Sequence, residues 1–168
     1  MRYLAGSASN THRENGFLAG LAEYAPKVEI LSSDQYSGVT TESAMQTAQK
    51  LLTQFPTVEA IFSPNAPTTS AMLRALQLAK RTGNVYLVGF DATEELLKSL
   101  KYGEIAGLVV QDPFRIGYLG VKTALAAKRK EKVEKRIDTG SRLILPSNLA
   151  DPEVEALLHP DLMKWLGE

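Results

Sequence analysis

Cysteine is absent from this chain of 168 residues. Its absence excludes a disulfide framework, a thiolate metal site and a cysteine nucleophile. Charge of one sign is not in excess either, because 19 basic residues balance 19 acidic ones. The one basic stretch, residues 128–136, is interleaved with Glu131 and Glu134, which is typical of a solvated helix end. We therefore expect no nucleic-acid partner.

Long apolar runs are missing as well. No run approaches the roughly 20 residues that a membrane-spanning helix needs. The stretch Met1–Gly6 is too short and turns polar too early for a signal peptide, so we expect no leader in this chain. The length suits a single domain with its own hydrophobic core.

Short apolar runs alternate with longer amphipathic stretches along the chain. We expect strands at residues 3–5, 28–31, 60–62, 85–90 and 108–110, each followed by a helix. Thr68 or Thr69 should cap the third helix and Thr93 the fourth, while the fifth should span residues 113–128. Five such units in series predict an α/β fold, a three-layer, doubly wound and mostly parallel sheet.

After residue 128 the alternation weakens. Residues 137–145 look extended, and Asp151 begins a short last helix. Trp165 is a candidate packing anchor in the tail.

Catalytic residue types are scarce. The two histidines, His12 and His159, have no evident nucleophile–base partner in the sequence. The acidic pair Glu94–Glu95 begins a predicted helix, where carboxylates favour the helix dipole. Gly6 and Ser7 stand where a phosphoacceptor domain would need an acidic pair. We therefore predict no catalytic residue, no metal site and no cofactor, and we do not expect an enzyme.

Polar residues follow the predicted strands at the points where the strands end. These residues are Arg13, Asn65, Asp91 and Gln111. Ligands of such sheets bind outside the carboxyl ends of the strands. Arg offers a rigid fork of donors, Asp accepts, and Asn and Gln do both, which suits the vicinal hydroxyls of a small sugar. Each residue also has a simpler interpretation, as a surface charge for Arg13 and as a turn or helix cap for the others.

A flavodoxin-like protein that binds FMN is an alternative. Residues 7–11 follow the first predicted strand, as a phosphate-binding loop does, and they offer hydroxyls at a helix start. This loop lacks the glycine that a close approach to phosphate usually needs. No second loop carries a flanking tryptophan, so the sequence favours FMN less than a sugar.

A series of short segments resembles the ribose-binding-protein family of type I periplasmic binding proteins. The segments are residues 13–17, 52–56, 58–62, 88–91, 109–113, 117–118, 137–140, 143–144 and 147–149. That family includes sugar receptors of ABC transporters and the effector domains of LacI-type repressors. Residues 109–113 and 137–140 resemble the transporter receptors most, so the sequence favours a transporter receptor. A repressor effector module is the alternative.

The resemblance implies a receptor of two lobes with a sugar held between them, and this chain resembles the carboxy-terminal lobe alone. Residues 1–112 would form the sugar-binding lobe, and residues 113–168 would partly pack on the other lobe. The implied partners are a small sugar, the other lobe and a membrane permease, in the periplasm or outside the cell. Without the other lobe, the 113–128 helix should either fold back onto the sheet or support a homodimer.

The resemblance also implies a set of sugar-contacting residues. By similarity these are again Arg13, Asn65, Asp91 and Gln111. Tyr36 is a candidate for stacking on a sugar face, since some relatives place an aromatic ring in that stretch. Many relatives have an acidic residue after the matching Asn, where this chain has Ala66 followed by Pro67.

Overall fold

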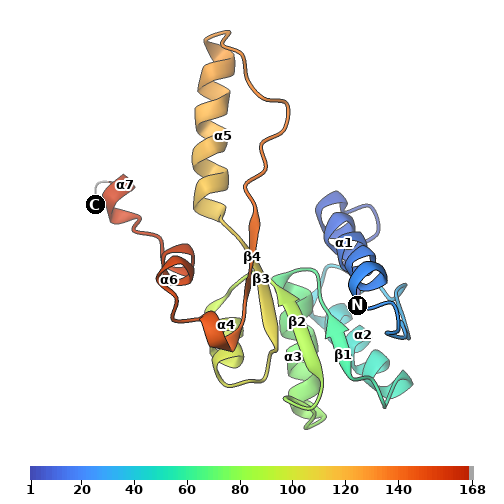
Figure 1. Ribbon diagram of the computed structural model, residues 1–168. Coiled ribbons are helices and arrows are strands. Elements are labelled where there is room, and N and C mark those ends of the chain that lie inside the picture. Colours follow the sequence, from blue (N-terminus) through green and yellow to red (C-terminus); the bar gives the residue numbers. More distant parts are fainter. Residues whose placement is uncertain (167–168) are drawn as a thin grey trace.

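A four-stranded sheet forms the centre of the molecule (Figure 1), and the computed structural model describes residues 1–166. Its strands are β1 (Ala60–Phe62), β2 (Tyr86–Phe90), β3 (Gly107–Gln111) and β4 (Ser141–Ile144), side by side in that order. β1, β2 and β3 run parallel, and β4 pairs antiparallel with β3. The prediction of an α/β fold with a mostly parallel sheet is therefore confirmed.

Two predicted strands do not form. Residues 28–31 have no regular structure, and Val28, Ile30 and Leu31 are exposed. Near the amino terminus, only Arg2 pairs, through a single parallel bridge to Tyr36. Among the described residues no strand pairs with residues 28–31, so their backbone joins no ladder. The described part of the chain thus has three βα units rather than five.

Seven α-helices and one 3₁₀ turn complete the described chain. They are α1 (Ala8–Tyr24), α2 (Thr41–Gln54), α3 (Ala66–Leu78), α4 (Glu94–Lys101), α5 (Pro113–Lys128), the 3₁₀ turn Pro146–Asn148, α6 (Pro152–Leu158) and α7 (Met163–Leu166). Thr93 caps α4 as predicted, since its side chain accepts from the Leu96 amide. The cap of α3 was predicted wrongly, because Asn65 takes that position and Thr68 lies inside the helix. The side chain of Trp165 lies outside the described residues.

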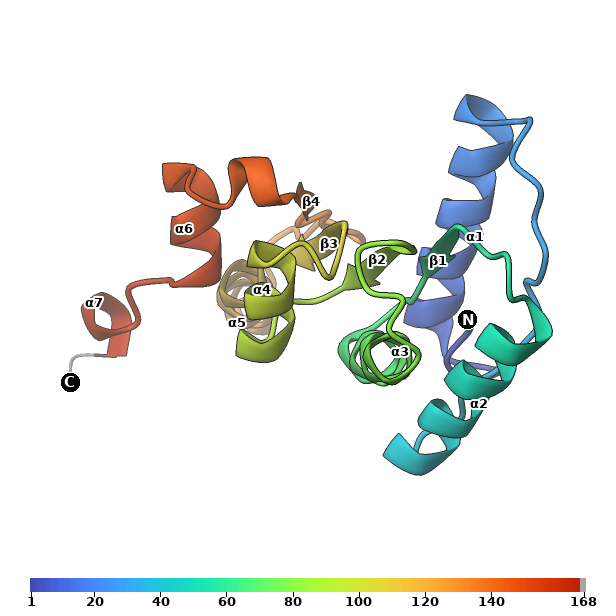
Figure 2. The ribbon, with the colours of Figure 1, turned by 90° about the horizontal axis from the view of Figure 1, so that it is seen from below.

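The hydrophobic core lies mainly on one face of the sheet. Helices α3 and α4 cover that face and α2 packs on α3, while α1 lies on the opposite side, near β1 (Figure 2). The largest fully buried apolar side chains are Met72, Leu73, Leu76, Leu87, Leu96, Leu100, Ile105, Leu108, Ile144 and Val154. They come from α3, α4, α6, three strands and the turn before β3, so this core fixes the strand ends that carry the candidate site.

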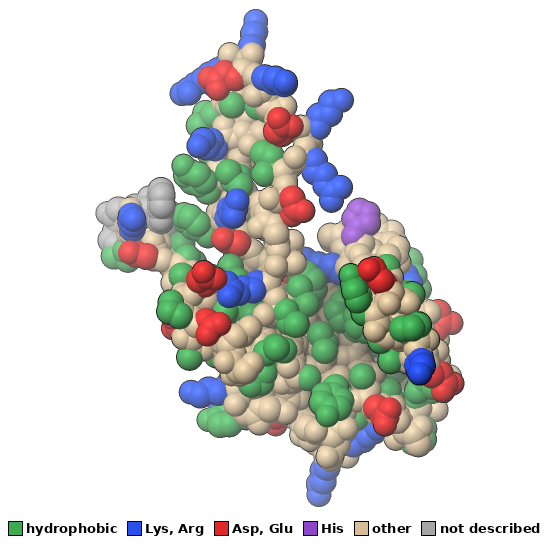
Figure 3. All heavy atoms as spheres, viewed as in Figure 1, with side chains coloured by type: hydrophobic (Ala, Val, Ile, Leu, Met, Phe, Trp, Pro, Cys, Tyr) green, Lys and Arg blue, Asp and Glu red, His purple; other side chains and the backbone are tan. Residues whose placement is uncertain are grey.

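Helix α5 projects away from the sheet and has no buried residue (Figure 1). Residues 129–140 return beside it to β4, and together they form an arm. Apolar side chains are exposed along the arm and basic ones gather at its tip (Figure 3). In this structure the helix is therefore not folded back onto the sheet.

No helix within residues 1–166 combines the length and the apolar character that crossing a membrane would require.

Candidate functional site: a polar rim at the strand ends

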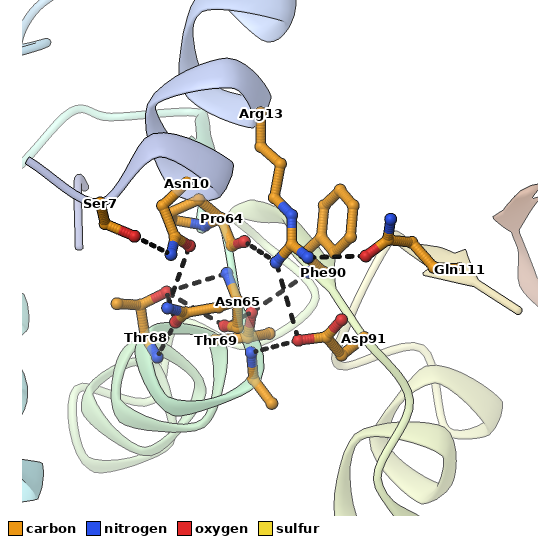
Figure 4. A network of polar contacts seen from close by, with 11 residues as sticks. Ser7, Asn10, Arg13, Pro64, Asn65, Thr68, Thr69, Phe90, Asp91 and Gln111 are labelled. Carbon is orange, nitrogen blue, oxygen red and sulfur yellow. Dashed lines mark hydrogen bonds and ion pairs between the residues drawn. The ribbon is translucent and has the colours of Figure 1, made fainter. Parts of the chain in front are cut away.

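Arg13 connects the ends of the parallel strands. It projects from α1, and its guanidinium donates to the Pro64 carbonyl oxygen at 2.9 Å and to Gln111 Oε1 at 2.7 Å (Figure 4). The carboxylate of Asp91 lies 3.9 Å from the same guanidinium. Three residues predicted from separate strand ends and loops, Arg13, Asp91 and Gln111, thus meet at one edge of the sheet. We call this group, with Asn65 and Phe90, the polar rim.

Phe90 supplies an apolar floor to the rim. The centre of the Arg13 guanidinium lies 3.8 Å from the centroid of the Phe90 ring, within the range of a cation–π contact. Phe90 is the last residue of β2 and is almost fully buried. The sequence prediction missed Phe90 as a site residue. Its position directly before Asp91, at the end of an apolar run, was the available signal.

Asp91 is held in an unusual backbone conformation. Its φ angle is +70°, which Asp tolerates better than most residues because its short side chain forms local hydrogen bonds. The Asp91 amide donates to the Val109 carbonyl, and its carboxylate accepts from the Ala66 amide at the start of α3. The alternative that Asp91 caps the following helix is wrong, because Thr93 caps it. The carboxylate remains partly open to solvent and can accept from a ligand.

Asn65 has a structural role that the sequence only partly indicated. Its Oδ1 accepts from the Thr68 amide and hydroxyl, which caps α3. Its Nδ2 donates to Asn10 Oδ1, and Asn10 Nδ2 in turn donates to the Ser7 hydroxyl (Figure 4). Asn65 and Asn10 are both buried, so this chain of contacts joins α1 firmly to the start of α3. An amide nitrogen carries two hydrogens, which leaves Asn65 one donor for a ligand.

Gln111 and Tyr36 differ in how they relate to the rim. Gln111 lies at the end of β3 and contacts Arg13, whereas the neighbouring Asp112, not Gln111, caps α5 by accepting from the Arg115 amide. Tyr36 is 44% exposed, and its ring lies 5.9 Å from the Arg2 guanidinium. No contact described for Tyr36 joins it to the rim, so its predicted sugar stacking stays a prediction.

The chemistry of the rim suits a neutral polyol. It places fixed N–H donors, a carboxylate acceptor and an amide around an aromatic floor, and hydroxyl groups both donate and accept. Arg13 is already oriented by its contacts before any ligand binds, which lowers the entropy cost of binding. The Asp91 side chain is 40% exposed, so the rim faces solvent there and does not by itself enclose a ligand.

An α/β lobe with polar groups beyond its parallel strand ends is the architecture of a ligand-binding domain. The family model described as a periplasmic binding protein domain matches residues 1–132, and the chain belongs to this family. The resemblance stated from the sequence segments is therefore confirmed.

Curated relatives include the ribose import binding protein of Salmonella typhimurium, which is 33% identical over 84% of this chain and 47% of that protein. The D-allose-binding periplasmic protein of Escherichia coli is 30% identical over 77% of this chain and 41% of that protein. This chain therefore spans about half the length of the curated relatives it matches.

Solved structures agree with this assignment. A carbohydrate transporter solute binding protein from Agrobacterium radiobacter, in complex with D-arabinose, is 36% identical with a TM-score of 0.87, over 94% of this chain and 53% of that one. A solute binding protein from Agrobacterium vitis with bound D-fucose is 30% identical with a TM-score of 0.79, over 95% of this chain and 54% of that one.

Proposed function

We propose that this chain is one lobe of a periplasmic sugar receptor of an ABC transporter, and that it binds one face of a small sugar at the polar rim. The observation that carries the proposal is the convergence of Arg13, Asp91 and Gln111 over the Phe90 ring. Two relatives are named for ribose and allose, and two similar structures hold arabinose and fucose, which supports a monosaccharide as the ligand.

The mechanism in the whole receptor would be binding rather than catalysis. A sugar that contacts both lobes favours the closed state, and the closed surface then docks on a membrane permease. The periplasm is the proposed location, because a relative is named as periplasmic. A LacI-type effector module is less well supported, since these relatives and similar structures are named as transport proteins.

Monosaccharide titration tests this function. The isolated chain should bind D-ribose, D-allose or D-arabinose with millimolar or weaker affinity, because half of the enclosing contacts are missing and the sugar stays partly solvated. In NMR spectra, the perturbed amides should cluster at Phe90, Asp91 and Gln111. Sugar-dependent shifts that avoid these residues, or no shift with any of the sugars, would contradict the proposal. Micromolar affinity by calorimetry would contradict the half-site interpretation.

Association through α5 is the second part of the proposal. Tyr118, Val121 and Leu125 recur at helical spacing on one face, and Val121 is 65% exposed. In the whole receptor this α5 face would pack on the other lobe, and in the isolated chain it would pack on a second copy.

Light scattering on concentrated protein should therefore give the mass of a dimer. Val121→Glu should restore the monomer, because a charge in the contact would have to be desolvated. Val39, which is 62% exposed elsewhere, provides the matched control: Val39→Glu should leave the dimer intact. A monomer at every concentration would refute the homodimer.

A further inference from the structure

The tip of the arm carries a cluster of basic side chains (Figure 3). We call residues 128–136 the basic tip. Two of its residues, Glu131 and Glu134, are acidic, and six are basic: Lys128, Arg129, Lys130, Lys132, Lys135 and Arg136. All nine residues of the basic tip are exposed, so the six cations stand in solvent at the far end of α5.

Charge is distributed unevenly between the basic tip and the rest of the chain. The whole chain has 19 basic and 19 acidic residues, so its net charge is zero. The basic tip has a net charge of +4, which leaves 13 basic and 17 acidic residues elsewhere and a net charge of −4. An anionic surface would therefore attract the tip of the arm and repel the body of the molecule.

Helix stability explains only half of this cluster. Helix α5 ends at Lys128, and cations at positions 128–130 interact favourably with the negative end of its dipole. The dipole effect falls off within one turn, so it does not account for Lys132, Lys135 and Arg136. In the described part of the chain, no ion pair joins any of the six cations to a carboxylate. Their charges are therefore available to an external anionic partner.

The position of the basic tip favours a flat anionic surface over a small anion. The tip lies at the end of a projecting arm (Figure 1), and the cavities beside β1 and between α2 and α3 contain none of its residues. A small soluble anion would need donors that converge in a hollow. A membrane surface needs no hollow, because its headgroups form an extended sheet of charge.

Apolar side chains among the cations favour a lipid surface over a nucleic acid. Val133 lies within the basic tip and is 37% exposed, and Ile137 follows it and is 44% exposed. Such side chains suit the boundary between lipid headgroups and acyl chains. Residues 128–140 contain no aromatic side chain on which unpaired bases could stack.

We propose that the basic tip is a membrane-docking surface that binds the headgroups of anionic phospholipids. The lysine and arginine side chains contact the lipid phosphates, while Val133 and Ile137 reach the headgroup boundary. The acidic body is held away from the membrane. The 16 residues of α5 span about 24 Å, several times the Debye length of about 8 Å at physiological ionic strength, so docking leaves the polar rim free.

Co-sedimentation with vesicles tests the basic tip. At low ionic strength the chain should sediment with phosphatidylcholine vesicles that contain about 30% phosphatidylglycerol, and not with pure phosphatidylcholine. Each basic side chain near such a surface strengthens binding about fivefold, so replacing Lys132, Lys135 and Arg136 by glutamine should weaken it more than about tenfold. Raising the salt to about 0.5 M should release the chain. Equal binding to neutral vesicles would overturn the proposal.

The matched control makes the same charge change elsewhere. Lys27, Arg74 and Lys98 are exposed residues outside the arm, and replacing all three by glutamine should weaken binding far less. Equal losses in the two triple variants would show that overall charge, rather than the basic tip, drives binding. That result would also overturn the proposal.

Two pairs of glutamates provide a gain of binding, which a folding defect cannot imitate. Glu131→Gln with Glu134→Gln raises the net charge of the basic tip from +4 to +6 and should tighten vesicle binding several-fold. Glu23→Gln with Glu29→Gln adds the same charge to exposed positions on the body and should tighten it less. The proposal is wrong if the second pair has the larger effect.

Soluble competitors distinguish the other sources of phosphate. Inorganic phosphate and a single-stranded oligonucleotide, compared per phosphate at equal ionic strength, should both bind more weakly than the vesicles. Tighter binding of inorganic phosphate would assign the basic tip to a free anion. Tighter binding of the oligonucleotide would assign it to a nucleic acid, and either result would exclude the membrane as its partner.

A fluorescent probe checks which end of the molecule meets the membrane. Because the chain has no cysteine, Val133→Cys creates a single attachment point for an environment-sensitive dye. On phosphatidylglycerol vesicles its emission should shift to shorter wavelength, since the dye leaves water. The same dye at Val39→Cys, an exposed position on the body, should not shift. A shift at residue 39 and none at residue 133 would contradict the proposed orientation.

Discussion

Replacing Arg13 by alanine should abolish monosaccharide binding to this chain. The guanidinium joins the Pro64 carbonyl, Gln111 and Asp91 above the Phe90 ring, so its loss removes a forked donor and the element that orients the other groups. Hydrogen bonds to a charged group contribute about 1.5–3 kcal/mol each, so affinity should fall more than tenfold. From a millimolar starting point, NMR titration would then detect no binding.

Two comparisons separate a binding role of Arg13 from a structural one. Arg13→Lys keeps the charge but not the planar fork, and should lose most of the affinity. Arg74→Ala removes an exposed arginine from α3 and should bind sugar like the unmodified chain. If Arg13→Ala binds with unchanged affinity, the rim is not the sugar site. Thermal unfolding of each variant shows whether a loss of binding reflects a loss of folding.

Gly89→Ala should destabilise the fold more than other glycine substitutions in the sheet and its helices. An added Cβ would overlap Thr69 Cγ2, come within 2.8 Å of the Thr69 hydroxyl and lie 2.9 Å from Leu108 Cδ2. Thr69 cannot move easily, because it is fully buried and its hydroxyl donates to the Asn65 carbonyl at 2.8 Å. Overpacking of this kind costs about 3 kcal/mol, which chemical denaturation would measure as a lower unfolding free energy.

The matched control is Gly117→Ala in α5. A Cβ there meets no atom within 4 Å, and alanine favours a helix, so stability should be unchanged or slightly higher. Combining Gly89→Ala with Thr69→Ser removes the overlapping methyl group and should recover part of the loss. A Gly89→Ala variant as stable as the unmodified chain would mean that β2 and α3 do not pack as closely as described.

The strands that the sequence predicted correctly are those that have a hydrogen-bonded neighbour strand in the structure. The runs at 60–62, 85–90 and 108–110 became strands because each can pair with the next and bury its side chains against α3 and α4. The runs at 3–5 and 28–31 have similar apolar character, but the first is next to a single bridge, Arg2 to Tyr36, and no described strand pairs with the second; periodicity does not report pairing. Sheet membership depends on pairing as well as on composition.

Part of the polar rim could also be predicted from the order of the strands. Parallel strands place their carboxyl ends together, so Asp91 and Gln111 could be assigned to one edge from the strand order alone. The arginine–phenylalanine contact could not, because it depends on how α1 crosses the end of β2. Nor could the buried pair of Asn10 and Asn65, since two separate helix starts must meet before these amides touch.

The arm built on α5 is an insertion in the topological sense. It leaves the sheet after Gln111 and re-enters at Ser141, two residues that face each other as the last pair of the β3–β4 ladder. A short hairpin turn could join these neighbours directly, and the core beneath would keep every buried side chain. The arm and the core beneath it are therefore separable, and a miniaturised lobe without its arm would retain the rim on an unbroken sheet.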